Sequence, residues 1–202
     1  MRTNLTFSEL LDLAVFGASL DRSNILSYNI HDGCYQGATY CTAGGFLYTP
    51  ERELFGGSAV LLPDTASASN VSEYANIKRF VGLVANSPET YLERSEITLV
   101  NATRETGLAT KLATKLRKYG FTISDRESIV NTKDPIMASR IDYVDILQNP
   151  TFGIPPSDPT LNLLQSFFNA PPTATGALNY TKLVGPKIEI ILGPDAKSLF
   201  DR

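Results

Sequence analysis

Four basic side chains recur at a spacing that could place them together on one surface. They are Arg104, Lys111, Lys115 and Lys118. At 3.6 residues per turn they fall on one stripe of a helix, next to an apolar face formed by Leu108, Leu112 and Leu116. A basic stripe of this kind can bind an anionic polymer or phospholipid headgroups, with about 1 kcal/mol from each lysine near the surface. The alternative is that the stripe is simply the solvated face of the helix.

The two cysteines, Cys34 and Cys41, stand in mirror positions about Gly37 and Ala38. A type II′ turn with Gly37 at its first central position would make them cross-strand neighbours in a hairpin. This register predicts a Cys34–Cys41 disulfide, which would indicate an oxidising, extracytoplasmic compartment. The alternative is a pair of unpaired thiols. With His31 as the only histidine, the chain lacks the ligands of a zinc site, and no metal site is predicted.

The 202 residues contain few signals for other kinds of function. The chain has no phosphate-binding loop, no dinucleotide fingerprint and no nucleophile elbow, so no cofactor is predicted. The net charge of −3 disfavours a nucleic-acid partner, because such proteins usually carry a basic excess. No window of eighteen apolar residues predicts a membrane span, and no signal peptide is expected before Thr3.

Residues 96–202 show an order of elements that could position the basic stripe. We expect strands at 97–100, 121–130, 140–147 and 188–192, with loops at 149–159 and 170–186. The first helix would be capped by Thr103 or Thr106 and end before Gly120. The second would start at Asp158-Pro159 and turn Leu161, Leu164, Phe167 and Phe168 inward. This order, β-α-β-β-α-β, predicts a split-βαβ, ferredoxin-like α+β module with two helices on one face of a four-stranded sheet.

The first 86 residues combine helices with short strands. Thr6 and Glu9 form a capping box that should open a helix ending near Gly17. Strands are expected at 24–30 and 58–62. Asn70 should cap a further helix, whose apolar face would be Tyr74, Ile77, Val81 and Val84.

Two stretches of residues 96–202 resemble a known bacterial family. A strand ending V-x-N-x-T, then G-L-A, an amphipathic helix and G-F-T resemble the opening of the LytR C-terminal domain. The run KIEIILGPD at 187–195 is similar to the strand and L-G-x-D motif that close that domain. The resemblance implies an envelope protein module that spans residues 96–202.

The first block resembles the last third of the catalytic domain of LytR–CpsA–Psr proteins. The resemblance rests on the segment around Thr6, D-x-S-N-I-x-S-Y at 21–28, a tyrosine-rich hairpin and a strand ending L-P-D. It implies that residues 1–86 are a partial sheet of that domain with flanking helices, joined by a linker at 87–95. Full-length relatives transfer glycopolymers from a polyprenyl pyrophosphate carrier to peptidoglycan, using Mg²⁺ and clustered arginines and aspartates. No such cluster occurs in residues 1–86, so no catalytic residue is predicted.

These observations predict the C-terminal part of a cell-envelope assembly protein, without transferase activity of its own. Its location would be extracytoplasmic, with a membrane anchor in a full-length parent. The alternative is a stand-alone, non-catalytic module that binds the cell wall or a protein; a cytoplasmic interaction protein is a third reading. Expected partners are peptidoglycan or an anionic wall polymer, and an upstream LytR–CpsA–Psr catalytic region.

Overall fold

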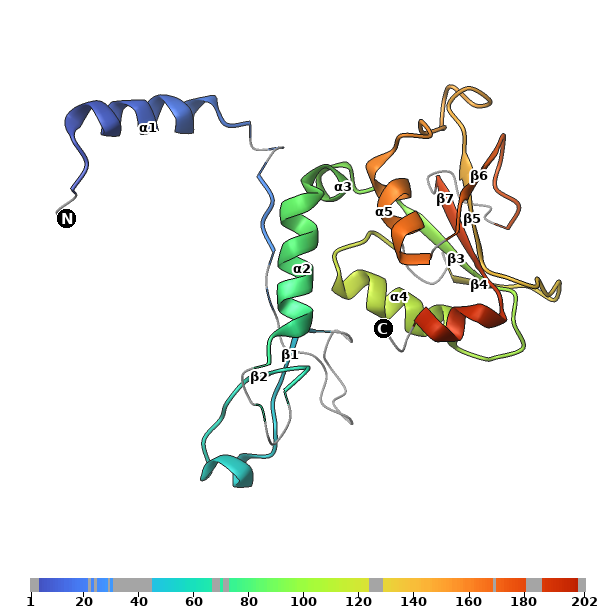
Figure 1. Cartoon of the computed structure of the whole chain (residues 1–202), viewed down its shortest axis with the longest axis horizontal. Coiled ribbons are helices and arrows are strands. Elements are labelled where there is room, and N and C mark those ends of the chain that lie inside the picture. The colour runs from blue at the N-terminus through green and yellow to red at the C-terminus, as the bar shows by residue number, and fades with distance from the viewer. Residues whose placement is uncertain are drawn as a thin grey trace.

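The fold is built on a five-stranded mixed sheet. The computed structural model describes residues 4–21, 23, 25–28, 30, 45–66, 70, 73–123, 129–168, 170–180 and 187–199. The strands are β3 (Ile97–Asn101), β4 (Ile129–Asn131), β5 (Arg140–Val144), β6 (Pro172–Thr175) and β7 (Ile188–Leu192), in the order β4-β3-β7-β5-β6 (Figure 1). Strand β3 runs parallel to β4 and β7, whereas β5 is antiparallel to β7 and parallel to β6.

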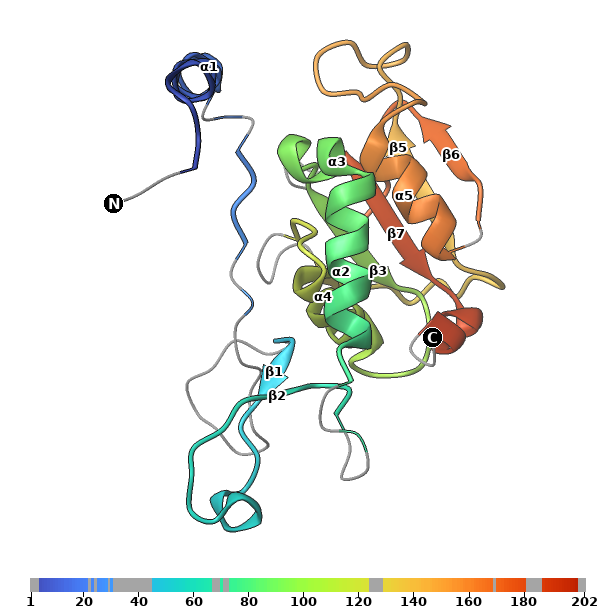
Figure 2. The same ribbon diagram turned by 60° about the vertical axis from the view of Figure 1, so that its left-hand side comes forward.

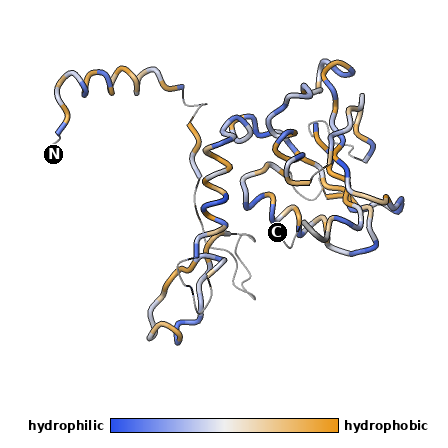
Figure 3. The backbone as a smooth tube through the Cα atoms, in the orientation of Figure 1, coloured by the Kyte–Doolittle hydropathy of each residue, from blue (hydrophilic) through white to orange (hydrophobic). Residues whose placement is uncertain are grey.

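The helices pack on one face of this sheet. Alternate strand residues, among them Leu99, Ile141 and Ile190, join one apolar core with α4 (Leu108–Lys118) and α5 (Pro159–Phe168). The predicted faces are confirmed, since Leu108, Leu112, Leu116, Leu161 and Leu164 are all buried. Figure 3 shows apolar colouring along the strands that these helices cover, as well as in α1 and α2. Alternation with a period of two residues therefore sets which face of each strand is covered.

The predicted α+β class is confirmed, but the topology differs from the split-βαβ pattern. Each helix connects two strands that are direct neighbours, β3 with β4 and β5 with β6. In a split unit another strand would lie between them. The fifth strand, β6, falls in the stretch 170–186 that was expected to be a loop because of its prolines and Gly176. Pro172 is tolerated because β6 lies at the edge of the sheet, where a missing N–H costs no ladder bond.

The start of α4 also differs from the expectation. Gly107, with φ of +82°, precedes the helix, and neither Thr103 nor Thr106 caps it. The Thr103 hydroxyl instead binds Asn101 Oδ1 at 2.6 Å and accepts the Glu105 N–H at 3.1 Å, which fixes the turn after β3. Gly120 ends the helix region with φ of +83°, as predicted. Residues 121–123 contribute only an isolated bridge, Glu96 with Thr122, and β4 begins at Ile129.

Residues 4–93 carry a few short elements. They are α1 (Phe7–Ser19), β1 (Leu47–Tyr48), a 3-10 turn (Arg52–Phe55), β2 (Leu62–Pro63), α2 (Ala75–Asn86) and α3 (Pro88–Glu93). Strands β1 and β2 pair antiparallel. The capping box of Thr6 and Glu9 is confirmed, with the Glu9 N–H donating to Thr6 Oγ1 at 3.3 Å.

Several expectations for this block are corrected by the structure. Residues 25–28 form no strand, and the strand expected at 58–62 begins only at Leu62. Helix α2 starts after Tyr74, so Asn70 does not cap it. Its inward face is Ile77, Phe80, Leu83 and Val84, while Tyr74 and Val81 are exposed. The segment 87–95, expected to be a linker, contains α3. Cys34, Cys41 and His31 lie outside the described residues, so the disulfide stays a prediction.

Helix α1 stands away from the other elements in both views (Figures 1 and 2). None of its residues is buried, and Phe7 is 82% exposed. Its apolar side chains Leu10, Leu11, Leu13, Val15 and Phe16 are all exposed. The apolar side of an amphipathic helix normally packs against another element.

An aromatic cluster joins the first block to the sheet. Tyr91 of α3 is 2% exposed and lies edge-on to Tyr28 and Phe80, at centroid distances of 5.6 and 6.3 Å. It also contacts Phe121 at 6.3 Å. The ring passes so close to Gly120 that a Cβ there would lie 2.9 Å from Tyr91 Cε1. Helix α3 is thus held by packing and does not act as a free linker.

Candidate functional site

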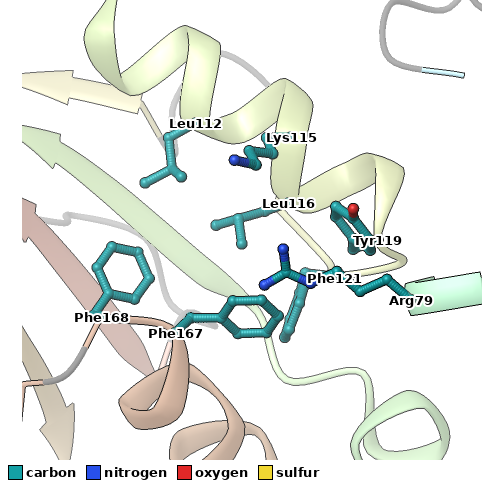
Figure 4. Close-up of a pocket in the computed structure, with 8 residues that line it drawn as sticks. All are labelled: Arg79, Leu112, Lys115, Leu116, Tyr119, Phe121, Phe167 and Phe168. Carbon is teal, nitrogen blue, oxygen red and sulfur yellow. The ribbon is translucent and has the colours of Figure 1, made fainter. Parts of the chain in front are cut away.

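A cleft opens where α2, α4 and α5 meet. Its floor is apolar and aromatic, and two cations and a phenol stand at its rim, as Figure 4 shows. The lining residues are Arg79, Leu112, Lys115, Leu116, Tyr119, Phe121, Phe167 and Phe168. The cleft holds about 50 Å³. Sites for drug-sized ligands usually measure about 300–1,000 Å³. This space therefore suits one small group of a longer ligand.

Aromatic rings hold the Arg79 guanidinium in place at this rim. Its Cζ lies 5.3 Å from the centroid of Phe167 and 5.8 Å from that of Tyr119. Phe167 in turn meets Phe121 edge-on at 6.0 Å. No ion pair of Arg79 with a carboxylate occurs in the part of the chain that the structure describes. Stacking leaves the N–H fork of a guanidinium available for a bidentate bond to an oxyanion.

Hydrogen bonds fix the opposite rim. Tyr119 Oη donates to Asn76 Oδ1 at 3.1 Å, and Asn76 Nδ2 donates to Asp64 Oδ2 at 2.7 Å. Lys118 Nζ forms an ion pair with the same carboxylate oxygen and lies 4.9 Å from the centroid of Phe46. Burial raises the pKa of Tyr119, which keeps its hydroxyl protonated as a donor. This network ties α2 and the segment after β2 to the end of α4.

The four basic residues predicted from the sequence do not form one free stripe. Lys111 is exposed on α4, and Lys115, one turn further on, lines the cleft. Lys118 is committed to Asp64, and Arg104 lies in the turn before the helix begins. The structure adds Arg79 and the rings of Phe121 and Phe167. No local pattern marks them, because they come from three distant segments that only the fold brings together.

A second polar cluster lies where α3 meets α5. Asp158 is fully buried, and its Oδ1 accepts the Leu161 N–H at 2.9 Å, as an N-cap should. Its Oδ2 has no hydrogen-bond partner among the described residues. Burial and the neighbouring Asp158 carboxyl raise the pKa of Glu93 to about 7, while Lys187 opposes that rise. Glu93 is therefore the carboxyl group of this cluster that exchanges its proton near neutral pH.

A polar row crosses the other face of the sheet. The register aligns Thr98, Glu189, Asp142 and Thr173 on neighbouring strands. Glu189 Oε1 accepts the Tyr180 N–H at 3.1 Å, and Asp142 Oδ2 pairs with Arg140 at 3.1 Å. Burial raises the pKa of Asp142, although Arg140 opposes the shift. Thr98, Glu189 and Asp142 are buried, whereas Thr173 on the edge strand is exposed.

The possible metal ligands among the described residues are dispersed. No group of three or more His, Cys, Asp or Glu side chains converges on a possible ion within them. Nor does any helix in this part of the chain have the length and apolarity needed to cross a bilayer. Among its described lining residues, the Arg79 cleft has two cations and one phenol but no carboxylate, thiol or imidazole.

Comparison with known proteins identifies the family of the part of the chain that forms the five-stranded sheet. The model of the family described as LytR cell envelope-related transcriptional attenuator matches residues 94–195, just over half of the chain. No curated protein and no solved structure matches. The matched range runs from the end of α3, through all five strands of the sheet, to the turn after β7. The chain therefore belongs to the LytR C-terminal domain family, a family of the cell envelope.

Proposed function

We propose that this protein is a non-catalytic accessory part of bacterial envelope assembly that binds an anionic wall polymer. The observation that carries the proposal is the Arg79 cleft, with a stacked guanidinium, a second cation at Lys115 and an aromatic floor. Phosphate groups along a polymer match a guanidinium fork, and its sugar or alcohol units match the apolar floor. Lys111, exposed one turn from Lys115, extends the positive surface along α4.

The test is pelleting of the full chain with purified sacculi, with and without their covalently bound anionic polymers. We expect pelleting only with polymer-bearing sacculi, and we expect it to fall as salt rises. Exposed charges are screened beyond a Debye length of about 10 Å at 0.1 M ionic strength. Equal pelleting with sacculi that lack the polymers would instead support binding to peptidoglycan itself. If the protein pellets with neither kind of sacculi, the proposal is wrong.

The proposal excludes transferase activity for this chain. Phosphoryl-group transfer of this kind needs arginines and a divalent metal on the pyrophosphate. Residues 1–86 contain no cluster of that composition, and no metal site forms among the described residues. We expect no metal-dependent pyrophosphate release from a polyprenyl pyrophosphate-linked substrate above that of heat-treated protein. Release that requires native protein and Mg²⁺ would overturn this part of the proposal.

We further propose that residues 1–86 complete a LytR–CpsA–Psr type domain, as their sequence suggests. The burial of this block supports the idea, because its described residues that reach a core, such as Phe46 and Phe80, are few and join the core of the sheet. No residue of helix α1 is buried, although the helix carries several large apolar side chains. Glycopolymer attachment would then be the work of the completed domain, with the C-terminal module as its polymer-binding accessory.

Exposure of α1 gives a direct prediction. Changing Leu11 and Phe16 to Lys should leave the melting temperature unchanged, since surface substitutions usually alter stability by less than about 0.5 kcal/mol. The same change should reduce binding of a hydrophobic dye and self-association in gel filtration. Leu112→Lys, at a buried position on α4, is the matched control and should unfold the protein. A large drop in melting temperature for the α1 variant would show that α1 is packed in solution.

A further inference from the structure

The Arg79 cleft takes only one small group of a polymer. It holds about 50 Å³ above an apolar floor. A polymer that places a phosphate at Arg79 must therefore continue outside the cleft, along the surface beside it. Its path depends on which neighbouring surface has room and hydrogen-bonding groups for the next units.

A polar groove runs along the solvent side of α5. It consists of two hollows of about 320 and 350 Å³, which adjoin because Asn162 and Ser166 line both. Ser87, at the junction of α2 and α3, lines the first hollow, and Gln165 lines the second. Volumes of this size are in the range of binding sites for sugar-sized groups.

The groove continues a seam between α2 and α5 that begins at the cleft. At one end of the seam, Arg79 Cζ lies 5.3 Å from the ring centroid of Phe167, as Figure 4 shows. At the other end, Ser87 and Leu163 line the groove together. Leu163 lies one turn before Phe167 on α5, and Ser87 is about 12 Å from Arg79 along α2 at 1.5 Å per residue. A single short oligomer can therefore reach both the cleft and the groove.

The groove offers neutral hydrogen-bonding groups. The polar side chains among its described lining residues are two amides, three hydroxyls and one carboxylate, from Asn162, Gln165, Ser87, Ser157, Ser166 and Glu89. Amides and hydroxyls both donate and accept, as the hydroxyl groups of a ligand require. The side chain of Gln165 has no partner among the described residues, so it is available to a ligand. The carboxylate of Glu89 repels a second phosphate, which favours a neutral unit here.

We propose that the groove along α5 is a subsite for neutral, hydroxyl-rich units of the anionic polymer whose phosphate is held at Arg79. The subsite rests on the proposed function, and it adds the path of the ligand and the chemistry of its uncharged part. The phosphate lies between Arg79 and Lys115, and sugar or polyol units pass over Leu163 towards Ser87. A polymer in which phosphates alternate with neutral units fits this arrangement better than one that carries a charge on every unit.

The test is pelleting of the full chain with polymer-bearing sacculi over a salt series. The variant combines Asn162→Ala, Gln165→Ala and Ser166→Ala. All three side chains are exposed and Ala is the best helix former, so the melting temperature should not fall. We expect roughly tenfold weaker binding from the lost hydrogen bonds to the ligand. The salt dependence should stay that of the wild type, because the variant removes no charge.

A single change guards against a failure of the triple variant to fold. Gln165→Ala removes no hydrogen bond within the described part of the chain and should still weaken binding by roughly threefold. Gln148→Ala and Thr110→Ala are the matched controls, since they remove an exposed amide and an exposed hydroxyl outside the groove. Both should bind as the wild type does.

Arg79→Gln separates the subsite from the proposed function. It should weaken binding and also reduce the salt dependence. If Arg79→Gln weakens binding and the groove variants do not, the subsite is wrong and the proposed function stands. If neither weakens binding, the polymer does not bind at the cleft and both are wrong. Weakening by the groove variants alone would separate the groove from the cleft and overturn the shared path. A groove-dependent signal on sacculi that lack the polymers would assign the groove to peptidoglycan and overturn the subsite too.

Discussion

Tyr91→Ala is expected to lower the free energy of unfolding by about 3–5 kcal/mol, the usual range for removing a large buried aromatic side chain. Tyr91 is 2% exposed and contacts Tyr28, Phe80 and Phe121. The substitution would leave a cavity between α2, α3 and the first turn after α4. In a chain of this size, that loss corresponds to a drop in melting temperature on the order of 10 °C.

The matched variant Tyr91→Phe separates packing from hydrogen bonding. The Tyr91 hydroxyl is buried and has no hydrogen-bond partner among the described residues. Burial also raises the pKa of Tyr91, so the group stays neutral. Removing an unsatisfied hydroxyl while keeping the ring should be neutral or stabilising by up to about 1 kcal/mol. Urea unfolding of both variants is the measurement, and a loss in Tyr91→Phe as large as in Tyr91→Ala would contradict the packing explanation.

Tyr91 also shows why the first block and the sheet behave as one unit. The sequence from 87 to 95 reads as a linker because Pro88 and several charged residues interrupt the apolar pattern. Yet Thr90 and Tyr91 are buried, and α3 packs against both α2 and α5. A six-residue helix with two buried side chains is too short to show a periodic pattern of apolar residues. The sequence pattern therefore did not indicate α3.

The local elements of the module could be predicted because their signals are local. Leu108, Leu112 and Leu116 repeat at the helical period, and Gly120 supplies the positive φ that ends the helix. Ile188–Leu192 is a short apolar run, typical of a strand covered on both faces. Asp158 caps α5 just before Pro159, as its position indicates.

Strand pairing and the start of α4 could not be predicted, because they depend on contacts that the local sequence pattern does not show. Strand β6 contains Pro172, which argues against a strand unless it lies at a sheet edge. Thr103 and Thr106, which precede α4, are of a residue type that often caps helices. Asn101, however, donates from Nδ2 to the Glu105 carbonyl at 2.8 Å and engages Thr103 through Oδ1. This turn delays the helix to Leu108 and takes Arg104 off the basic stripe.

The candidate site was predictable only in part for the same reason. Lys111 and Lys115 were identified because both lie on one helix. Lys118 has the same spacing, but Asp64, far away in the sequence, neutralises it. Arg79 sits on a different helix and gains its role from Phe167 and Tyr119. A sequence pattern can place charges on a helix, but it cannot show which of them a distant carboxylate has already engaged.

Removal of the basic residues at and beside the cleft gives the second large expected effect. If the cleft binds an anionic wall polymer, Arg79→Gln together with Lys111→Gln and Lys115→Gln should remove about 1 kcal/mol for each charge. The combined loss, about 3 kcal/mol, corresponds to a roughly hundredfold weaker affinity. Gln is a good helix former, and the buried Leu112 and Leu116 are untouched, so the fold should survive.

Two controls each remove one positive charge, against three in the triple variant. Lys133→Gln removes an exposed lysine from the loop after β4, away from the cleft, and Lys118→Gln removes the lysine that Asp64 engages. Both should bind almost as the wild type does, although Lys118→Gln should also lower the melting temperature. Pelleting with polymer-bearing sacculi over a salt series measures all of these. A shallower salt dependence in the triple variant alone would place the polymer at the cleft, because fewer phosphates would then be neutralised there. A loss of about 1 kcal/mol in Lys133→Gln, as large as the loss per charge in the triple variant, would instead mean that only the net charge of the chain matters, and the cleft would lose its assigned role.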